Sequence, residues 1–232
     1  MGIKKNLTII LAGGTGCRFG EKYPKQFFRI FGKTLLEHSI HRFDIHPSIE
    51  GIIVVVHPEY EGKALEILNK NRFKKIERIM AGGRTRQESS YIGVMSVEKE
   101  YENVLIHDAV RPLVSSEMID NLITELNTHP AVIPAILMTD TVVEVNSDSR
   151  VTGIPERQVL RMVQTPQAFR FELLKTAHKL ARENRINNAV DDCSLIIRFN
   201  LADVFVIEGS DRNLKITSPV DLEIARKIWR KP

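Results

Sequence analysis

Short apolar stretches alternate with amphipathic ones along most of the chain. Five apolar runs have the length of buried strands and span 7–11, 51–57, 76–80, 104–107 and 131–137. Between them, apolar residues recur three and four positions apart, which predicts helices at 35–43, 60–69, 86–97 and 116–126. Ser115-Ser116 and Ser218-Pro219 are typical helix starts, and the second predicts a terminal helix that ends near 228.

This alternation predicts an α/β fold, a single Rossmann-like, three-layer domain that spans 1–232. Strands joined through helices form right-handed βαβ units, so the sheet should be mostly parallel with helices on both faces. In such sheets, ligands bind beyond the carboxyl ends of the strands. We therefore expect Gly14, Gly82-Gly83 and His107-Asp108 to meet at one rim of the sheet.

The alternation breaks between Met138 and Gln164. Two β-prone stretches lie there, at 141–145 and 159–163, and a polar turn at 146–150 follows the first of them. A β-arm inserted at about 138–164 has too few apolar residues for a core of its own, so it needs a surface to pack on. That surface is either the edge of its own domain or a second subunit, which the arm would embrace.

The composition is that of an ordinary globular protein. Of 232 residues, 43% are hydrophobic and 27% are charged. The 33 Lys and Arg only slightly exceed the 29 Asp and Glu, and no basic helix carries interleaved aromatics, so we expect no nucleic-acid partner. The sequence contains no run of 18 apolar residues, so we expect no membrane partner. The only cysteines, Cys17 and Cys193, favour a reducing, cytoplasmic location.

A glycine-rich turn follows the first apolar run. Residues 11–20 read Leu-Ala-Gly-Gly-Thr-Gly-Cys-Arg-Phe-Gly, and Pro-Lys-Gln follows at 24–26. Glycines let backbone N–H groups approach phosphate oxygens, and Arg18 and Lys25 add two cations. The spacing matches neither a P-loop nor a dinucleotide fingerprint, which argues against an NAD-dependent oxidoreductase. We expect three aromatic residues beyond the turn to lie in the core beneath it: Phe27, Phe28 and Phe31.

Eight segments, in order, resemble those of one family. They lie at 11–18, 24–26, 82–89, 107–112, 140–141, 164–169, 191–195 and 213–217. Each segment is a weak signal alone, but their order over nearly the whole chain is specific. The chain resembles the polyol-phosphate cytidylyltransferase family, which includes enzymes that act on 2-C-methyl-D-erythritol 4-phosphate and on ribitol 5-phosphate.

The resemblance implies transfer of CMP from CTP to a polyol phosphate, with pyrophosphate as the leaving group. A phosphate monoester is mostly dianionic at pH 7, so this nucleophile needs no general base. The reaction needs cations that bring two polyanions together and stabilise developing charge. The resemblance gives that catalytic role to Arg18, Lys25 and Lys215. Asp108 would hold Mg²⁺ or another divalent cation; the alternative is a turn-forming aspartate.

The resemblance also implies binding residues for both substrates. Those for the nucleotide are Leu11, Ala12, Gly13, Gly14, Gly16, Gly82, Gly83, Ser89, Asp108, Ala109 and Arg111. Those for the acceptor phosphate are Thr141, Arg157 and Thr165, of which Arg157 offers a bidentate fork. In the family, Thr141 and Arg157 reach into the neighbouring subunit's site. The expected partner is therefore a second copy, in a homodimer with shared active sites.

The acceptor has two candidates. The opening Leu-Ala-Gly-Gly resembles the ribitol-phosphate branch, whereas 83–89, 164–169 and 191–195 resemble the methylerythritol branch. We expect 2-C-methyl-D-erythritol 4-phosphate, an isoprenoid precursor, as acceptor, with ribitol 5-phosphate or a related pentitol phosphate for cell-surface polymers as the alternative. A non-catalytic nucleotide-binding module is a more distant alternative. Such a module is expected to lose Lys25, Asp108 or Lys215, and all three are present in this sequence.

The roles of two charged pairs stay open. Asp191 and Asp192 either bind a metal or form an exposed pair at the N-terminus of a helix at 193–199. Arg84 and Arg86 lie beside the expected base-binding glycines, where either of them is able to serve the nucleotide or only to face solvent.

Overall fold

The computed structural model describes residues 5–14 and 24–230. Its strands are β1 (Asn6–Ala12), β2 (Arg29–Ile30), β3 (Lys33–Thr34), β4 (Gly51–Val56), β5 (Ile76–Ala81), β6 (Asn103–Asp108), β7 (Ala131–Leu137), β8 (Glu144–Val145), β9 (Val151–Gly153), β10 (Arg161–Val163), β11 (Gln167–Arg170) and β12 (Phe205–Glu208). Its helices are α1 (Leu35–Asp44), α2 (Glu61–Asn71), α3 (Arg86–Met95), α4 (Ser116–Glu125), α5 (Phe171–Glu183), α6 (Asp192–Arg198) and α7 (Pro219–Arg230), with short 3-10 turns η2 (Lys25–Phe27), η3 (Pro58–Tyr60) and η4 (Arg157–Val159). The expected strands and helices outside the arm are confirmed, whereas β2, β3, β11, β12 and α5 were not expected.

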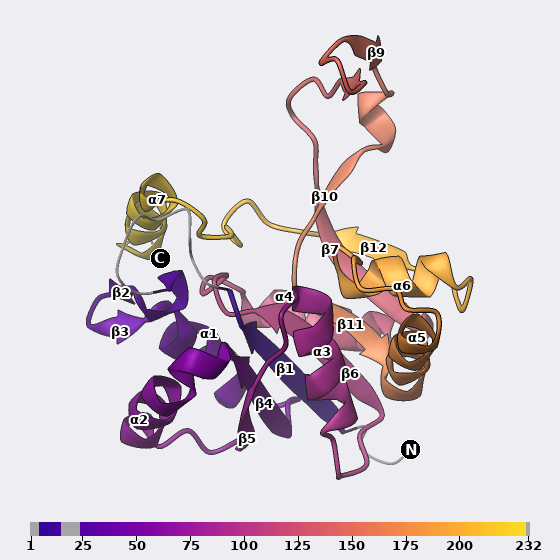
Figure 1. The fold of residues 1–232 in the computed structure, drawn as a ribbon. Helices are drawn as coiled ribbons and strands as arrows, with labels where there is room; N and C mark the ends of the chain where they lie inside the picture. Colours follow the sequence, from indigo (N-terminus) through magenta and orange to yellow (C-terminus); the bar gives the residue numbers. More distant parts are fainter. Residues whose placement is uncertain (1–4, 15–23, 231–232) are drawn as a thin grey trace.

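One sheet of eight strands carries the fold (Figure 1). Its order is β10-β7-β11-β6-β1-β4-β5, and β12 also pairs with β7. Strands β6, β1, β4 and β5 are parallel, as expected, whereas β11 and β10 run antiparallel to their neighbours. In the register, Leu11 pairs with Asp108 and Ala12 pairs with Val56. The carboxyl ends of the central strands therefore meet at one rim.

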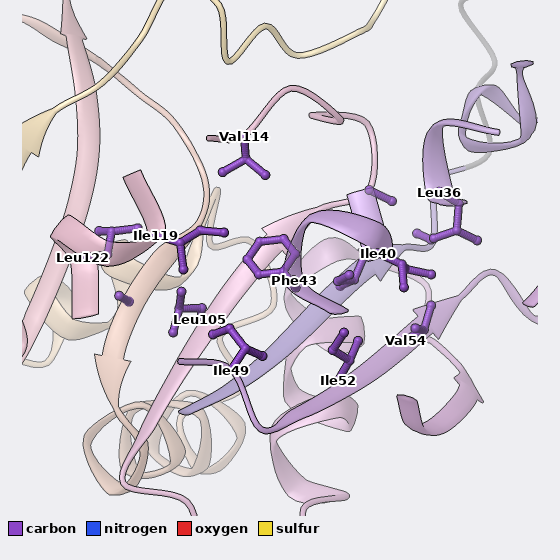
Figure 2. Close-up of a cluster of buried hydrophobic side chains, with 14 of the residues drawn as sticks. Leu36, Ile40, Phe43, Ile49, Ile52, Val54, Leu105, Val114, Ile119 and Leu122 are labelled. Carbon is purple, nitrogen blue, oxygen red and sulfur yellow. The ribbon is translucent and has the colours of Figure 1, made fainter. Parts of the chain in front are cut away.

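Helices cover both faces of this sheet and complete a three-layer fold. Side chains alternate along a strand, so Ile10 of β1 packs on one face, in a cluster that includes Phe43 of α1 and Ile119 of α4 (Figure 2). Its neighbour Ile9 packs on the other face, in a cluster to which α3 and α5 contribute, for example Leu174. The central strand is buried on both sides, which explains its uninterrupted apolar sequence. No helix in the described part of the chain is long and apolar enough to cross a membrane.

The prediction that Phe31 lies in the core is wrong. Phe27 is buried and Phe28 is half-buried, but Phe31 is 53% exposed. Phe31 and Gly32 form the turn between β2 and β3, and both have left-handed backbone angles, with φ of 47° and 83°. This turn keeps Phe31 outside the core, and its only ring contact among the described aromatic pairs is an edge contact with Trp229 of α7.

The segment between β7 and β11 projects from the body of the molecule, with β9 at its far end (Figure 1). Strands β8 and β9 pair only with each other, and β10 returns antiparallel along β7. This segment, residues 138–164, is the predicted arm. Apolar side chains along it face solvent: Val143, Val145, Val151, Ile154 and Val159. Apart from β10, which joins the main sheet, the arm stands away from the body of the molecule and leaves these side chains uncovered.

Candidate active site

A cavity of about 340 Å³ lies at the rim where β1, β4, β5 and β6 end. The predicted nucleotide-binding residues that line it are Leu11, Ala12, Gly13, Gly14, Gly83, Ser89 and Asp108. The two predicted catalytic lysines, Lys25 and Lys215, line the same cavity. The predicted Gly16 and Arg18 lie outside the described residues. The structure thus brings together predicted site residues from the two ends of the chain.

Gln26 binds the end of β1 and the start of the glycine-rich segment, at Ala12 and Gly14. Its buried amide donates to the carbonyl of Ala12 at 2.7 Å and to that of Gly14 at 2.9 Å. These bonds connect η2 to the end of β1, so Lys25 is fixed beside the turn. The sequence indicated Gln26 only as part of the Pro-Lys-Gln motif and predicted no role for it. The signal for its role was its place beside Lys25, where a side-chain amide is able to satisfy turn carbonyls.

Ser89 shapes the second glycine loop. Its hydroxyl donates to the carbonyl of Thr85 at 2.9 Å and accepts from the N–H of Gly83 at 3.2 Å. A Cβ at Gly82 would lie 2.7 Å from the Ser89 Oγ, and a Cβ at Gly83 would lie 2.1 Å from Cγ of Glu88. The loop therefore needs both glycines, although Gly82 lies beside the cavity rather than in its wall.

Asp108 lies at the end of β6 between two cations. Its Oδ2 is 2.7 Å from Nζ of Lys215, and its Oδ1 is 3.3 Å from Nε of Arg86. Burial would raise the pKa of Asp108, but the charges of Arg86 and Lys215 outweigh burial and hold that pKa well below its usual range. Asp108 is thus a carboxylate at neutral pH, the form that binds a divalent cation.

The donor set fits a metal ion that arrives with phosphates. No group of three or more His, Cys, Asp and Glu residues in the described part of the chain is arranged as a metal site. Mg²⁺ characteristically takes one or two carboxylates and completes its shell with water and substrate phosphates. Asp108 provides one such ligand beside a cavity with two lysines and a glycine-rich turn, which suits a magnesium–triphosphate complex.

A buried network extends from Asp108 into the protein. Arg86, the first residue of α3, donates from Nη1 to Oδ2 of Asp192 at 2.7 Å, and Asp192 Oδ1 also accepts from Ser90 and faces Nε2 of His178 at 3.2 Å. Both interpretations of Asp192 in a metal site or an exposed pair are wrong, because Asp192 is 1% exposed and bound by these donors. Its neighbour Asp191 caps α6. Arg86 is likewise not a solvated charge.

Three predicted binding residues lie behind the cavity wall. Thr165 accepts from the N–H of Asp108 at 3.0 Å, Ala109 donates its N–H to Leu11, and Arg111 donates from Nη1 to the carbonyl of Asn213. All three are buried and do not line the cavity. They hold the loops that carry Asp108 and Lys215, so their contribution in this structure is positioning.

His107 completes the same wall. Its Nδ1 lies 3.2 Å from Oγ1 of Thr165, and its Nε2 lies 3.1 Å from the carbonyl of Arg111. Burial lowers the pKa of His107 to about 4, against the opposing charge of Asp108. The ring is therefore neutral at pH 7 and serves as a fixed hydrogen-bonding spacer.

Two predicted acceptor-binding residues lie on the arm. Thr141 and Arg157 are both exposed, and Arg157 donates from Nη1 to the carbonyl of Thr139 at 3.0 Å within the arm. Because the arm projects from the body (Figure 1), neither residue lines the cavity that contains Asp108 of the same chain. A single chain does not bring the predicted acceptor-binding residues together.

The chain is similar in sequence to proteins named as enzymes and in fold to solved structures. It is 40% identical to bifunctional ribulose 5-phosphate reductase/CDP-ribitol pyrophosphorylase Bcs1 of Haemophilus influenzae, an alignment that covers 99% of this chain but 49% of that protein, so the chain spans about half of that relative. It is 36% identical to 2-C-methyl-D-erythritol 4-phosphate cytidylyltransferase of Thermobifida fusca, over 95% of this chain and 92% of the relative. The 4-diphosphocytidyl-2C-methyl-D-erythritol synthase of Anaerococcus prevotii superposes with a TM-score of 0.86 at 29% identity, over 99% and 100% of the two chains.

The family model agrees with the motifs. The model for IspD, 2-C-methyl-D-erythritol 4-phosphate cytidylyltransferase, matches residues 7–231. That range includes the glycine-rich turn after β1, the cavity and the arm. The predicted family and enzyme class are confirmed: the chain belongs to the IspD family of cytidylyltransferases.

Proposed function

We propose that this chain transfers CMP from CTP to a polyol phosphate and releases pyrophosphate. The observation that carries the proposal is Asp108, a buried carboxylate with Lys215 at 2.7 Å, in a cavity that Lys25 and the Gly13-Gly14 turn also line. This set of groups suits a nucleoside triphosphate with its metal ion. Among the described residues that line the cavity, no hydroxyl is hydrogen-bonded to the histidine, His57, which agrees with a phosphate acceptor that needs no base.

Each group has a distinct part in the proposed reaction. Lys25 and Lys215 bind and orient the triphosphate, and their charges stabilise the transition state at the α-phosphorus. Asp108 is the ligand for Mg²⁺, which when bound neutralises charge on the phosphates. The turn at Gly13-Gly14 offers backbone N–H groups to phosphate oxygens, and the loop at 82–89 reads the cytosine edge. The proposed location is the cytoplasm.

The proposed acceptor is 2-C-methyl-D-erythritol 4-phosphate. Relatives that carry this acceptor in their names match nearly the whole of this chain and of themselves, as in Thermobifida fusca. A second candidate is ribitol 5-phosphate, because the relative named as a CDP-ribitol pyrophosphorylase has the higher identity, 40% against 36%. The two acceptors differ in chain length and branching beyond the phosphate, so one active site should prefer one of them.

Pyrophosphate release distinguishes these acceptors. The purified protein is assayed with CTP and Mg²⁺ against 2-C-methyl-D-erythritol 4-phosphate, ribitol 5-phosphate, ribulose 5-phosphate and glycerol 3-phosphate. We expect kcat/KM for the first to exceed the others by at least about tenfold. A larger kcat/KM for ribitol 5-phosphate assigns the chain to the second candidate. No turnover with any phosphate, from protein that binds CTP, contradicts the transferase proposal and favours a nucleotide-binding module.

We further propose a homodimer whose arms complete the active sites. The uncovered apolar side chains of the arm, among them Val151 and Ile154, need a partner surface, and a second copy is one that is always available. Thr141 and Arg157 would then reach the partner's cavity, which explains why neither lines the cavity of its own chain. In this arrangement Lys25 and Arg157 of one active site come from different subunits.

Mixing two inactive variants tests this arrangement. Lys25→Ala and Arg157→Ala should each be nearly inactive, but a refolded mixture contains heterodimers with one doubly damaged site and one intact site. Random pairing makes about half of the dimers mixed, so roughly a quarter of wild-type activity should return. A mixture that stays inactive, although mass spectrometry shows heterodimers, contradicts shared sites while leaving the proposed reaction intact.

A further inference from the structure

A second cavity, of about 740 Å³, lies between α3 and α5 on the helical layer that contacts Ile9 of β1. It shares Arg84 and Thr85 with the wall of the candidate active site and is otherwise separate from it. Its volume is in the range of small-molecule sites. The lining side chains used below are Arg84, Glu88, Tyr91, His178, Arg182 and Arg185.

The walls of this cavity carry an uncompensated positive charge. Three arginines face one carboxylate, Glu88, and none of the arginines forms an ion pair with a described residue. The carboxylate of Glu88 accepts from the backbone N–H of Arg84 at 2.8 Å. The guanidinium of Arg182 lies 5.0 Å from the centre of the Tyr91 ring, a contact that orients its fork. The cavity therefore suits an anion with about two negative charges.

His178 supplies an independent indication of a ligand. The side chain is 1% exposed and lines the cavity, and its Nε2 faces Ser90 and Asp192 at 3.2 Å. Its Nδ1, on the other side of the ring, is buried and has no hydrogen-bond partner among the described residues. Buried polar atoms in native proteins are nearly always paired. A polar group of a ligand in the cavity would give Nδ1 the hydrogen-bond partner it lacks.

The segment after α5 forms one wall of the cavity, and hydrogen bonds from Gln87 of α3 hold it in place. Gln87 donates from Nε2 to the carbonyl of Ile186 at 2.7 Å and accepts the N–H of Ala189 at 2.9 Å. These two bonds fasten the segment after α5 to α3, and Asn187 of that segment lines the cavity. These bonds place Arg185, in the segment after α5, in the wall of the same cavity as the first turns of α3.

We propose that this cavity binds a small molecule through a phosphate group, either inorganic phosphate or a phosphate monoester. Guanidinium forks match phosphate oxygens in pairs, and a phosphate dianion matches the excess of two positive charges. Three arginines offer more N–H donors than the two oxygens of a carboxylate can accept. The site lies outside the candidate active site and does not depend on the proposed reaction.

Two-dimensional ¹H–¹⁵N NMR of the full chain tests the proposal. Inorganic phosphate and glycerol 3-phosphate are titrated separately at constant ionic strength, and the amides of Tyr91 and Asn187 report on this cavity while those of Gly13 and Gly14 report on the active site. We expect saturable shifts at Tyr91 and Asn187 with a dissociation constant of their own. Tighter binding of glycerol 3-phosphate identifies a phosphate monoester as the ligand, and equal or weaker binding identifies phosphate alone.

Matched variants separate a built site from general attraction. Arg182→Gln should weaken binding at Tyr91 and Asn187 by about tenfold. His178→Gln keeps a donor near Ser90 and Asp192 but removes Nδ1, and it should weaken binding at least about threefold. Lys179→Gln removes the same charge from the exposed side of α5 and should change the constant less than twofold.

Two results would overturn the proposal. One is the absence of saturable shifts at Tyr91 and Asn187 in the folded wild-type chain. The other is an equal effect of Arg182→Gln and Lys179→Gln, which would indicate only long-range attraction to a basic surface. Shifts at Gly13 and Gly14 bear on the candidate active site alone, so failure at one site is distinguishable from failure at the other.

Discussion

Asp192→Asn should lower the free energy of unfolding by about 3 kcal/mol without changing the size of the side chain. Every polar partner of the Asp192 oxygens is a donor: Arg86 at Oδ2, and Ser90 and His178 at Oδ1. An asparagine must turn its NH₂ group toward one of these donors, whichever way the amide is placed. Removing one partner of a buried ion pair costs about 3–5 kcal/mol. The lower end applies because Arg86 keeps its contact with Asp108.

The pH dependence of this difference follows from the pKa of Asp192. Burial would raise that pKa, but the charge of Arg86 and the bonds from His178 and Ser90 hold it well below its usual range. A carboxyl group whose pKa is lower in the folded state stabilises the fold above its unfolded pKa, near ~3.9, and this stabilisation is lost as the pH falls through the folded pKa. The difference between wild type and variant should therefore be constant from about pH 7 to about pH 5 and shrink below about pH 4.

Urea unfolding followed by circular dichroism measures this difference, and thermal melts should show a decrease in Tm of roughly 6–12 °C. Asp203→Asn is the matched control, because Asp203 is exposed and forms no hydrogen bond or ion pair among the described residues; it should change the free energy of unfolding by less than about 0.5 kcal/mol. If Asp192→Asn is as stable as this control at pH 7, the buried network does not have the energetic role argued from its geometry.

Three further predictions concern the candidate active site. Lys25→Ala and Lys215→Ala should each lower kcat by roughly 100-fold with the circular dichroism spectrum unchanged, and retention of more than about half of wild-type kcat would contradict their catalytic role. Asp108→Asn should raise the Mg²⁺ concentration for half-maximal activity, measured by magnesium titration at fixed CTP, because one ligand charge is lost; an unchanged titration would remove Asp108 as the metal ligand. UTP should be a poor donor, with kcat/KM at least about 100-fold below that of CTP, because uracil has reversed hydrogen-bond donors and acceptors and would leave polar groups of the loop at 82–89 unpaired. Equal turnover of UTP and CTP would refute the proposed role of this loop.

The central strands were predictable because each is buried on both faces. Strand β4 reads Gly-Ile-Ile-Val-Val-Val without a polar interruption, and all six of its residues are buried. Strand β11 gives no such signal, because it is a four-residue strand, Gln-Ala-Phe-Arg, placed antiparallel between β6 and β7 by pairings distant in sequence. Strand β12 lies at an edge with Phe205 and Val206 exposed, so its sequence lacks the pattern of a buried strand.

The meeting of Gly14, Gly83 and Asp108 was predictable because the carboxyl ends of parallel strands lie at one edge of a sheet. The places of Lys25, Ser89 and Lys215 were expected only from the resemblance to the family. The network behind them was not expected. Arg86 and Asp192 are 106 positions apart, and nothing local distinguishes Arg86 from the solvated Arg84 two positions earlier. Asp191 and Asp192 looked like one pair at a helix terminus, but they have different roles. Asp191 caps α6, whereas Asp192 points inward to Arg86, a partner distant in sequence that only the fold brings near.

The structure gives a different reason from the sequence for why glycine occupies positions 13, 82 and 83. From sequence, Gly13, Gly82 and Gly83 indicate backbone that approaches a ligand. In the structure, a Cβ on Gly13 would lie 3.2 Å from the Ser89 Oγ and a Cβ on Gly82 would lie 2.7 Å from the same atom. Ser89 is therefore a common contact of the loops after β1 and β5, and its own bonds to Thr85 and Gly83 fix the second loop. Segments that lie far apart in the sequence form one unit because a single hydroxyl fits between two glycines, and Ser89 and Gly13 both line the candidate active site that results.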